Sequence, residues 1–432
     1  MSSGMMLLII LGIVFSLILS STWVFLSLAL TGVFGFLFFS GYSVWTIVPQ
    51  LAFTTNESFV LTCLPLFVLM GELLLHSGAS KNLYSGLKPW VEPIPGKLLH
   101  SNILACTIFA AVSGSSAVTV ATIGSIAVPE LEKLGYNKGT ALGSLAGAGT
   151  LGLLIPPSIV MIVYGAITGQ SVARLFAAGI FPGLLIALLF MIYVVVMSVL
   201  RPSIAPASLT EQSFKEKIIG TIKILPIIAL ICLVLGIIYL GIATPTEAGA
   251  IGAFGALVIV LTHGNMSWLV LKEASFTTLK TTCMVMFIVI GASILSSCLA
   301  YLKIPQDLMK YLVAIGLSKW VIFSIFCLIY IGLGCLFDGI SMMLLTLPII
   351  YPVIVGLGYN PIWFGVVLVV LIETAQITPP VGFNLYVLKN ISGESIGMIV
   401  KNSIPFFFLM LIGLIILCFL PQIALWLPDK LM

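Results

Sequence analysis

Residues 113–137 read SGSSAVTVATIGSIAVPELEKLGYN, and the first four of them raise a question about the whole chain. Ser-Gly-Ser-Ser interrupts an apolar sequence where an uninterrupted helix would otherwise continue. These residues could supply a serine nucleophile, a surface of small side chains for helix packing, or a backbone opened to bind an ion. The rest of the chain distinguishes these alternatives.

The composition of the chain places it in a membrane. Its 432 residues are 60% hydrophobic and only 7% charged. Soluble proteins contain about 25% charged residues, so this composition cannot cover a water-exposed surface. Spans need roughly 20 apolar residues each, which leaves room for about a dozen segments. The net charge of +4 is spread over loops, and we therefore expect no nucleic acid as a partner.

The chain repeats itself internally. A shift of 223 positions superposes four proline-marked landmarks of the first half on the second. They are Pro129 on Pro352, Leu134-Gly135-Tyr136 on Leu357-Gly358-Tyr359, Pro156-Pro157 on Pro379-Pro380, and Pro182 on Pro405. Four landmarks at one offset indicate two copies of one unit.

Hydropathy predicts the same order of elements in each half. Three spans (5–20, 22–40 and 50–76; then 218–241, 246–263 and 276–300) precede two short apolar arms (98–113 with 116–131; then 320–336 with 340–357). A segment interrupted by Pro-Pro and a final span follow. Arms split by polar residues are typical of re-entrant hairpins, because exposed backbone at membrane depth survives only where protein or a cavity covers it.

If the hairpins do not cross the membrane, each half has five crossings. Because five is odd, the second half begins on the opposite side of the membrane and is inverted relative to the first. With both termini outside, the outer side receives Arg174, Lys303, Lys310, Lys319 and Lys430, and the inner side receives the other 13 of the 18 basic residues. The positive-inside rule favours this orientation.

We therefore predict an all-α polytopic fold of two inverted repeats. The first covers 1–200, with scaffold spans 1–76, a hairpin at about 98–131 and a broken helix at about 139–168. A cytoplasmic linker covers 201–217. The second covers 218–432, with scaffold spans 218–300, a hairpin at about 320–357 and a broken helix at about 361–389.

The two Pro-Pro segments, GLLIPPS and AQITPPV, predict broken helices at membrane depth. Consecutive prolines remove two N–H donors and push the preceding residue out of helix. A break leaves free carbonyls at one half-end and free N–H groups at the other, which can bind ions without buried charge. A single Pro-Pro favours a simple kink. Two matching breaks, each preceded by a polar hairpin tip, favour the transporter architecture of discontinuous helices.

The opening stretch is interpreted in this context. As a nucleophile, Ser115 would need a base and an oxyanion hole, yet no histidine lies nearby and its repeat mate is Asp338. The alternative without a ligand is that these small residues serve only helix packing. We favour an ion site, because hydroxyl and carbonyl oxygens suit hard cations. Asp338 and Glu373 are the ionisable residues expected at depth, although Asp338 could equally cap the helix that follows. We interpret Glu247 as a structural residue of its helix start.

The chain resembles the large membrane subunit of TRAP transporters, the tripartite ATP-independent periplasmic carriers of bacteria. The resemblance covers essentially the whole length, through PLFVLMGELL, SGSSAVTVATIGSIAVPELEKLGY, LGLLIPPSI, ATPTEAGA and ITPPVGFNLYV. It implies a sodium-driven elevator carrier of organic acids such as C4-dicarboxylates or sialic acid, in the bacterial inner membrane. It also implies a small four-helix membrane subunit and a soluble periplasmic substrate-binding protein as partners.

Transferred to matching positions, the resemblance implies two sodium sites. One falls on Ser113, Ser115, Gly152, Ile155 and Pro157, and the other on Gly334, Ala375, Thr378 and Val381. The family often has glycine where this chain has Ala375, a change that a backbone carbonyl ligand would survive. The candidate solute ligands are Ser116, Thr150, Asp338, Glu373 and Asn384.

We therefore expect an importer in which both hairpins and both breaks move as one domain against a fixed scaffold. The chain lacks a nucleotide-binding motif such as GxxxxGK[ST], so it is not expected to hydrolyse ATP. Two alternatives stay open: an ion-coupled carrier that works without a binding protein, and an intramembrane enzyme that uses Ser115 or Asp338.

Overall fold

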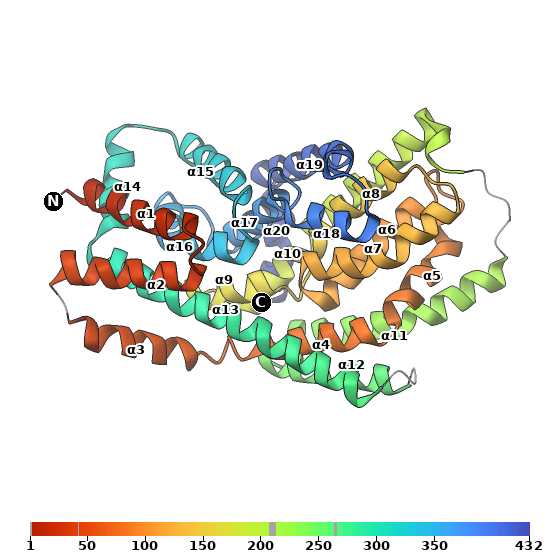
Figure 1. Ribbon diagram of the computed structural model, residues 1–432, viewed down its shortest axis with the longest axis horizontal. Coiled ribbons are helices and arrows are strands. Elements are labelled where there is room, and N and C mark those ends of the chain that lie inside the picture. Colours follow the sequence, from red (N-terminus) through yellow and green to blue (C-terminus); the bar gives the residue numbers. More distant parts are fainter. Residues whose placement is uncertain (1, 42, 207–212, 263–265) are drawn as a thin grey trace.

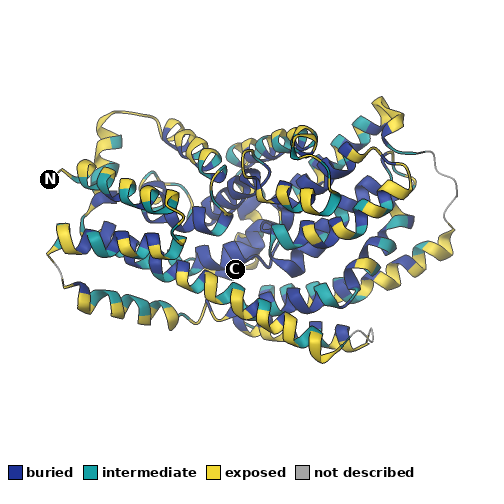
Figure 2. Cartoon of the chain, viewed as in Figure 1, coloured by how far each residue is buried: buried dark blue, intermediate teal, exposed yellow. Residues whose placement is uncertain are grey.

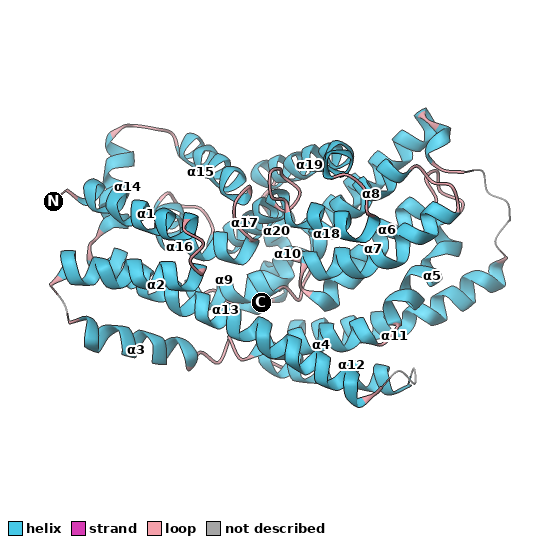
Figure 3. Cartoon of the chain, viewed as in Figure 1, coloured by secondary structure: helices cyan, strands magenta, loops and turns pink. Residues whose placement is uncertain are grey.

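The computed structural model describes residues 2–41, 43–206, 213–262 and 266–432, and all regular structure within these ranges is helical (Figure 3). Six helices are long and apolar enough to cross a membrane, or seven if the bent pair α4 and α5 forms one span. The bend between these two helices is 68°. The expectation of an all-α polytopic membrane protein is confirmed at this level.

The first half of the chain runs from α1 to α10. Its helices are α1 (Ser3–Leu19), α2 (Val24–Gly35, continued by the π-helical turn Phe36–Ser40), α3 (Val44–Asn56), α4 (Cys63–His76), α5 (Ala79–Val91), α6 (Leu98–Ser113), α7 (Ser116–Lys133), α8 (Lys138–Gly149, continued by the 3-10 turn Thr150–Gly152), α9 (Ile159–Thr168) and α10 (Val172–Leu200).

The second half runs from α11 to α20. Its helices are α11 (Phe214–Tyr239), α12 (Pro245–Thr262), α13 (Trp268–Tyr301), α14 (Ile304–Ala314), α15 (Lys319–Gly334), α16 (Gly339–Gly356), α17 (Pro361–Ala375), α18 (Phe383–Ser392), α19 (Ile396–Phe419) and α20 (Gln422–Leu431).

Helix boundaries follow the 223-residue offset through the hairpin and break regions. Shifting α7 by this offset reproduces both ends of α16, and shifting the start of α8 reproduces the start of α17. Both breaks also carry a cis peptide bond between their two prolines. The landmarks recognised in the sequence thus correspond to matching local structure in the two halves.

One predicted span is wrong in its boundaries. The segment 50–76 is two helices, because α3 ends at Asn56 and α4 begins at Cys63. The side chains of Thr54 and Asn56 turn back to carbonyls of the preceding turn, at 3.0 Å and 2.9 Å, within a run of polar residues. The corresponding segment of the second half lies inside the continuous helix α13.

Three helices were not predicted, and the linker is shorter than expected. The unpredicted helices are α5, α14 and α20, which lack the long apolar runs that mark spans. Ser213 caps α11 through a capping box, so residues 214–217 are helical and not linker. Residues 207–212 of the predicted linker lie outside the described residues.

The helices form two layers (Figure 1). Helices α2, α3, α13, α4, α12 and α11 extend along one side of the molecule, and the hairpins, breaks and final spans lie across them. Within the long layer, α2 packs on α13 and α4 packs on α12. The 223-residue offset relates these two pairs, because it places α2 on α12 and α4 on the end of α13.

The core centres on α17, which is buried at every residue from Ile362 to Ala375. Helices α6 and α8 are also buried along most of their length. Figure 2 shows buried positions concentrated in the interior of the molecule, with exposed positions on the outer helices. Glu247 accepts hydrogen bonds from the backbone N–H and the hydroxyl of Thr244, both at 2.8 Å. This is the helix-start role that the sequence predicted for Glu247.

A close helix crossing joins the two halves at α5 and α11. A Cβ added at Gly220 would lie 2.5 Å from the Gly86 carbonyl oxygen, and one added at Gly86 would lie 2.6 Å from the Gly220 oxygen. The backbones therefore approach as closely as only glycine allows, as at small-residue crossings in membranes.

We expect Gly220→Ala to lower the free energy of unfolding by about 1–3 kcal/mol, because the added methyl group must push the helices apart. Thermal unfolding in detergent measures the effect. Gly236→Ala on the same helix is the control, since nothing lies within 4 Å of a Cβ added there. Equal stability of the two variants would contradict the crossing.

Candidate functional site

The first hairpin tip, residues 113–116, lies directly against the first break, residues 150–158. A Cβ added at Gly152 would lie 2.6 Å from both the N and the Cα of Ser116. One added at Gly114, which has a φ of +57°, would lie 3.0 Å from the Pro157 carbonyl oxygen. Backbone therefore packs on backbone, which concentrates carbonyl oxygens and N–H groups in one place.

The hydroxyls of the first tip are arranged within the tip itself. Ser113 Oγ lies 2.7 Å from Thr119 Oγ1 and 3.4 Å from the Ser115 carbonyl oxygen. Ser115 is half-buried, and among the described residues its hydroxyl has no hydrogen-bond partner. Ser115 therefore has no base beside it in the described chain, whereas its oxygen is free to bind a ligand.

The second hairpin makes the matching contact with the second break, residues 375–382. A Cβ added at Gly334, the last residue of α15, would lie 1.9 Å from Ala375 Cβ. Gly152 and Ala375 are repeat mates, so the same position of each break touches its own hairpin. The structure thus places Gly152 against Ser115 and Ser116 of the first tip, and Ala375 against Gly334 of the second hairpin.

The two breaks differ in exposure. Gly152 and Pro157 are buried and Ile155 is half-buried, whereas Val381 is 39% exposed and Thr378 is half-buried. The Thr378 hydroxyl donates to the Thr374 carbonyl at 2.8 Å. The first site is therefore enclosed by protein, while the second opens on one side.

The five candidate solute ligands do not form one cluster of free groups. Thr150 Oγ1 donates to the Gly147 carbonyl at 2.6 Å. Asp338 is exposed and caps α16 by accepting from the Ser341 N–H at 3.2 Å, which is the capping role that the sequence left as its alternative. Asn384 is fully buried, and neither polar atom of its amide has a partner in the described chain. Among these three, Asn384 alone has buried hydrogen-bonding capacity left over.

Glu373 joins the two halves of the molecule. Its Oε1 accepts from the Leu153 N–H of the first break at 2.6 Å and from the Ser116 hydroxyl of the first tip. Glu373 is fully buried on α17, and its Oε2 has no partner among the described residues. A side chain of the second half thus contacts both parts of the first site.

Two contributors to this region were missed in the sequence. Thr119 lies one helical turn after Ser115, and this i, i+4 spacing could have indicated it. The Leu153 N–H carried no signal, because a backbone donor is present at every residue except proline.

A cluster of charged side chains joins the end of α7, the first residue of α8 and the turn before α19. Lys138 Nζ lies 2.6 Å from Glu132 and 3.2 Å from Glu394. Hydrogen bonds to Glu132 and then Glu394 raise the pKa of Lys138 above its ordinary value. The cluster connects the end of the first hairpin to the turn before α19, within the layer that carries both tips.

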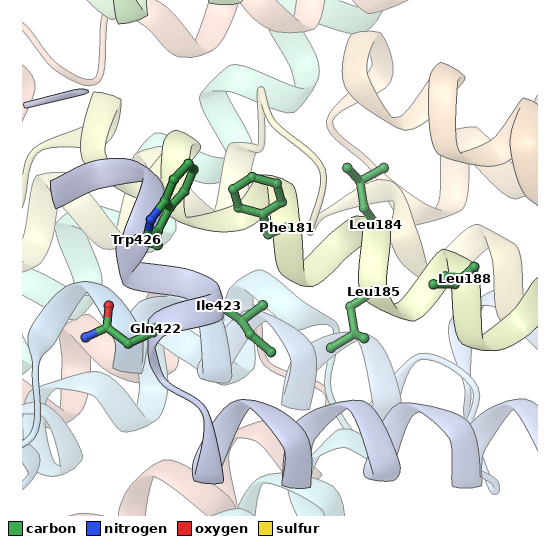
Figure 4. Close-up of a pocket in the computed structure, with 7 residues that line it drawn as sticks. All are labelled: Phe181, Leu184, Leu185, Leu188, Gln422, Ile423 and Trp426. Carbon is green, nitrogen blue, oxygen red and sulfur yellow. The ribbon is translucent and has the colours of Figure 1, made fainter. Parts of the chain in front are cut away.

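A separate apolar groove of about 530 Å³ lies between α10 and α20 (Figure 4). Phe181, Leu184, Leu185 and Leu188 of α10 line it together with Gln422, Ile423 and Trp426 of α20. The opposite face of α10 packs on the first break, since a Cβ added at Gly183 would lie 2.7 Å from Ile155. None of the residues that line the groove belongs to a tip or a break.

Comparison with known proteins gives a consistent result. The family model for the tripartite ATP-independent periplasmic transporter, DctM component, matches residues 11–423. The chain is 36% identical to the C4-dicarboxylate TRAP transporter large permease protein DctM of Pseudomonas aeruginosa, covering 93% of this chain and 94% of that one. It is 29% identical to the sialic acid TRAP transporter large permease protein SiaM of Vibrio cholerae, over 86% and 87%.

A solved structure shares the fold. The YdaH transporter of Alcanivorax borkumensis has a TM-score of 0.61 at 13% identity, and the match covers 90% of this chain and 88% of that one. At this identity the likeness concerns the arrangement of helices alone.

We expect Gly334→Ala to separate the second hairpin from its break, because the new methyl group would occupy the position of Ala375. Hydrogen exchange should show faster exchange of the amides of residues 335–341 than in the unmodified protein. Gly332→Ala in the same helix turn is the control, since nothing lies within 4 Å of a Cβ there. Unchanged exchange in Gly334→Ala would show that the hairpin is not held by this contact.

Proposed function

This chain belongs to the DctM component family of tripartite ATP-independent periplasmic transporters, the large permease subunits, and on that basis we propose that it couples the import of an organic acid to sodium entry. The family consists of transporter permeases, so we assign it transport and no enzymatic reaction. The observation that carries the proposal is the matching contact of each hairpin with its own break, through Gly152 in the first half and Ala375 in the second.

Oxygen atoms at these contacts are the proposed ligands of two sodium ions. The first set is Ser113, Ser115, Gly152, Ile155 and Pro157, and the second is Gly334, Ala375, Thr378 and Val381. Hydroxyl and carbonyl oxygens suit a hard monovalent cation. Without a carboxylate among these ligands, each ion would bind weakly enough to leave on the side where sodium is scarce.

The solute would bind between the two tips. We propose the hydroxyls and backbone N–H groups of the tips, with Ser116, Thr150, Asp338, Glu373 and Asn384, as the groups that meet it. The unpartnered amide of Asn384 supports this placement, because a buried polar group without a partner is costly until a ligand satisfies it. The names of the relatives favour C4-dicarboxylates or sialic acid as solutes.

The chain would act with two partners that the family implies, a small four-helix membrane subunit and a periplasmic substrate-binding protein. We place it in the bacterial inner membrane with both termini in the periplasm. The long layer of α2, α3, α13, α4, α12 and α11 would be the fixed scaffold of an elevator (Figure 1). The hairpins and breaks would slide past it, and the first three spans of a half would contact the small subunit.

Removing a proposed hydroxyl ligand should weaken sodium binding without disturbing the fold. In vesicles that contain the three-component transporter, Ser115→Ala and Thr378→Ala should each raise the sodium concentration for half-maximal succinate or sialic acid uptake by about tenfold. Ser125→Ala is the control, because it removes a hydroxyl with the same kind of bond as Thr378, to the Thr122 carbonyl at 2.8 Å, but on α7 and outside both proposed ligand sets.

Wild-type sodium dependence in both ligand variants would show that these hydroxyls do not bind the ion. Uptake by this chain and the small subunit, without any soluble protein, would favour the alternative of a carrier that needs no binding protein.

If one layer slides past the other, distances between residues of the two layers should differ between the inward-facing and outward-facing states. Spin labels on Phe254 of α12 and Lys389 of α18, both exposed, should move by several ångströms between inward and outward conditions. Labels on Trp45 of α3 and Phe254, both in the proposed scaffold, should keep their separation. Pulsed electron resonance measures both pairs. Constant distances in the first pair would refute the elevator.

A further inference from the structure

We propose that Glu373 is a positioning residue that couples the two sodium sites by tying the second half of the chain to the first tip and the first break. The inference rests on the proposed function, since it assumes that sodium binds at both hairpin contacts. It assigns to the carboxyl group of Glu373 the coupling of the ion sites, in addition to the contact with the solute proposed above.

The contacts of Glu373 reach both the first tip and the first break, next to the proposed ligands of the first site. One oxygen, Oε1, accepts both from the Leu153 N–H at 2.6 Å and from the Ser116 hydroxyl. Leu153 follows Gly152 in the first break, and Ser116 follows Ser115 in the first tip. Because Oε2 has no partner in the described chain, these two bonds alone orient the carboxyl group.

The same side chain stands next to the second site. Glu373 lies two residues before Ala375, in the last turn of α17, and Ala375 touches Gly334 of the second hairpin. The second tip also reaches this point, because a Cβ added at Gly339 would lie 2.4 Å from Ile372 and 3.6 Å from Leu153. Both hairpins and both breaks therefore meet around Glu373 and Leu153.

The contact that Glu373 makes between the halves has no equivalent at the positions related to it by the 223-residue offset. The mate of Glu373 is Thr150, whose hydroxyl bonds to Gly147 within its own helix. The mate of Ser116 is Gly339, which has no side chain to donate a bond. The described residues therefore hold one such tie across the halves and not a symmetric pair, so its loss cannot be compensated by the other half.

A physical route to cooperative ion binding follows from this geometry. A sodium ion at the first site draws the first tip against the first break, which sets the positions of Leu153 and Ser116. Through Oε1 these two donors hold the last turn of α17, where Ala375 forms one wall of the second site. The conformational entropy lost when the first ion orders these residues is then not lost again when the second ion binds. The two sites are therefore positively coupled.

The test titrates sodium chloride against choline chloride at constant ionic strength and follows the thermal unfolding midpoint of the complex with the small subunit. Bound ions raise the midpoint, and the slope of this rise against the logarithm of the sodium concentration gives the number of ions bound. The titration therefore yields an occupancy curve without any solute. The occupancy curve of the wild type should have a Hill coefficient clearly above 1, with about 2, the number of proposed sites, as its upper limit. Glu373→Met removes the acceptor at similar volume and should lower this coefficient to about 1, with half-saturation raised about tenfold.

Two further variants make the result specific. Glu373→Gln keeps an acceptor oxygen at the same place and should retain the wild-type coefficient. Ser116→Ala removes one of the two bonds with little change in volume and should lower the coefficient even if Glu373→Met fails to fold. Glu247→Met is the matched control: Glu247 also accepts from one backbone N–H and one hydroxyl, but both belong to Thr244 at a local helix start.

The outcomes separate the two claims. A sodium-responsive wild type whose Hill coefficient is unchanged in Glu373→Met and Ser116→Ala would overturn the tie and leave the proposed function intact. A wild type with a coefficient of 1 would also overturn the tie alone. A wild type without any response to sodium would overturn the proposed function and the tie together.

Discussion

A helix broken at membrane depth must have its free backbone groups covered by other parts of the protein, and the architecture of this chain follows from that constraint. The first break is covered by the first hairpin tip, close enough that only glycine fits at position 152. The second break meets the second hairpin through Gly334 and Ala375. Each hairpin therefore covers its own break, and each contact gathers backbone groups in one place.

The hairpin–break contacts of the two halves are not identical. Repeat mates differ at the positions closest to the breaks, where Ser115 corresponds to Asp338 and Thr150 corresponds to Glu373. The Ser115 hydroxyl has no hydrogen-bond partner in the described chain, whereas the Asp338 carboxylate caps the start of α16 by accepting from the Ser341 N–H. The first break is enclosed and the second is partly exposed. The two contacts between hairpin and break are therefore not equivalent, although both involve the buried helix α17.

Small residues carry much of the packing in this molecule. Within a bilayer, lipid chains are as apolar as leucine side chains, so helices associate through close fit and hydrogen bonds. The crossing of Gly86 and Gly220 joins α5 to α11, and Gly183 lets α10 approach the first break. The long layer of helices, by contrast, exposes large apolar side chains such as Trp45 and Phe254, which suits contact with lipid or another subunit.

The membrane class, the helices on either side of both polar tips, the interruptions at both Pro-Pro segments and the family that the comparisons established could all be predicted from the sequence alone. These features are local: apolar runs, polar tips and prolines act on the residues beside them. The sequence missed the division of α3 from α4 and the helices α5, α14 and α20, because hydropathy does not register polar or amphipathic helices of this length. The tertiary structure alone decided that Glu373 meets Leu153 and Ser116, residues 220 and 257 positions away. It also decided that one break is enclosed and the other open. Contacts between the halves depend on how rigid elements dock, and a docking surface leaves no periodic or compositional mark in the chain.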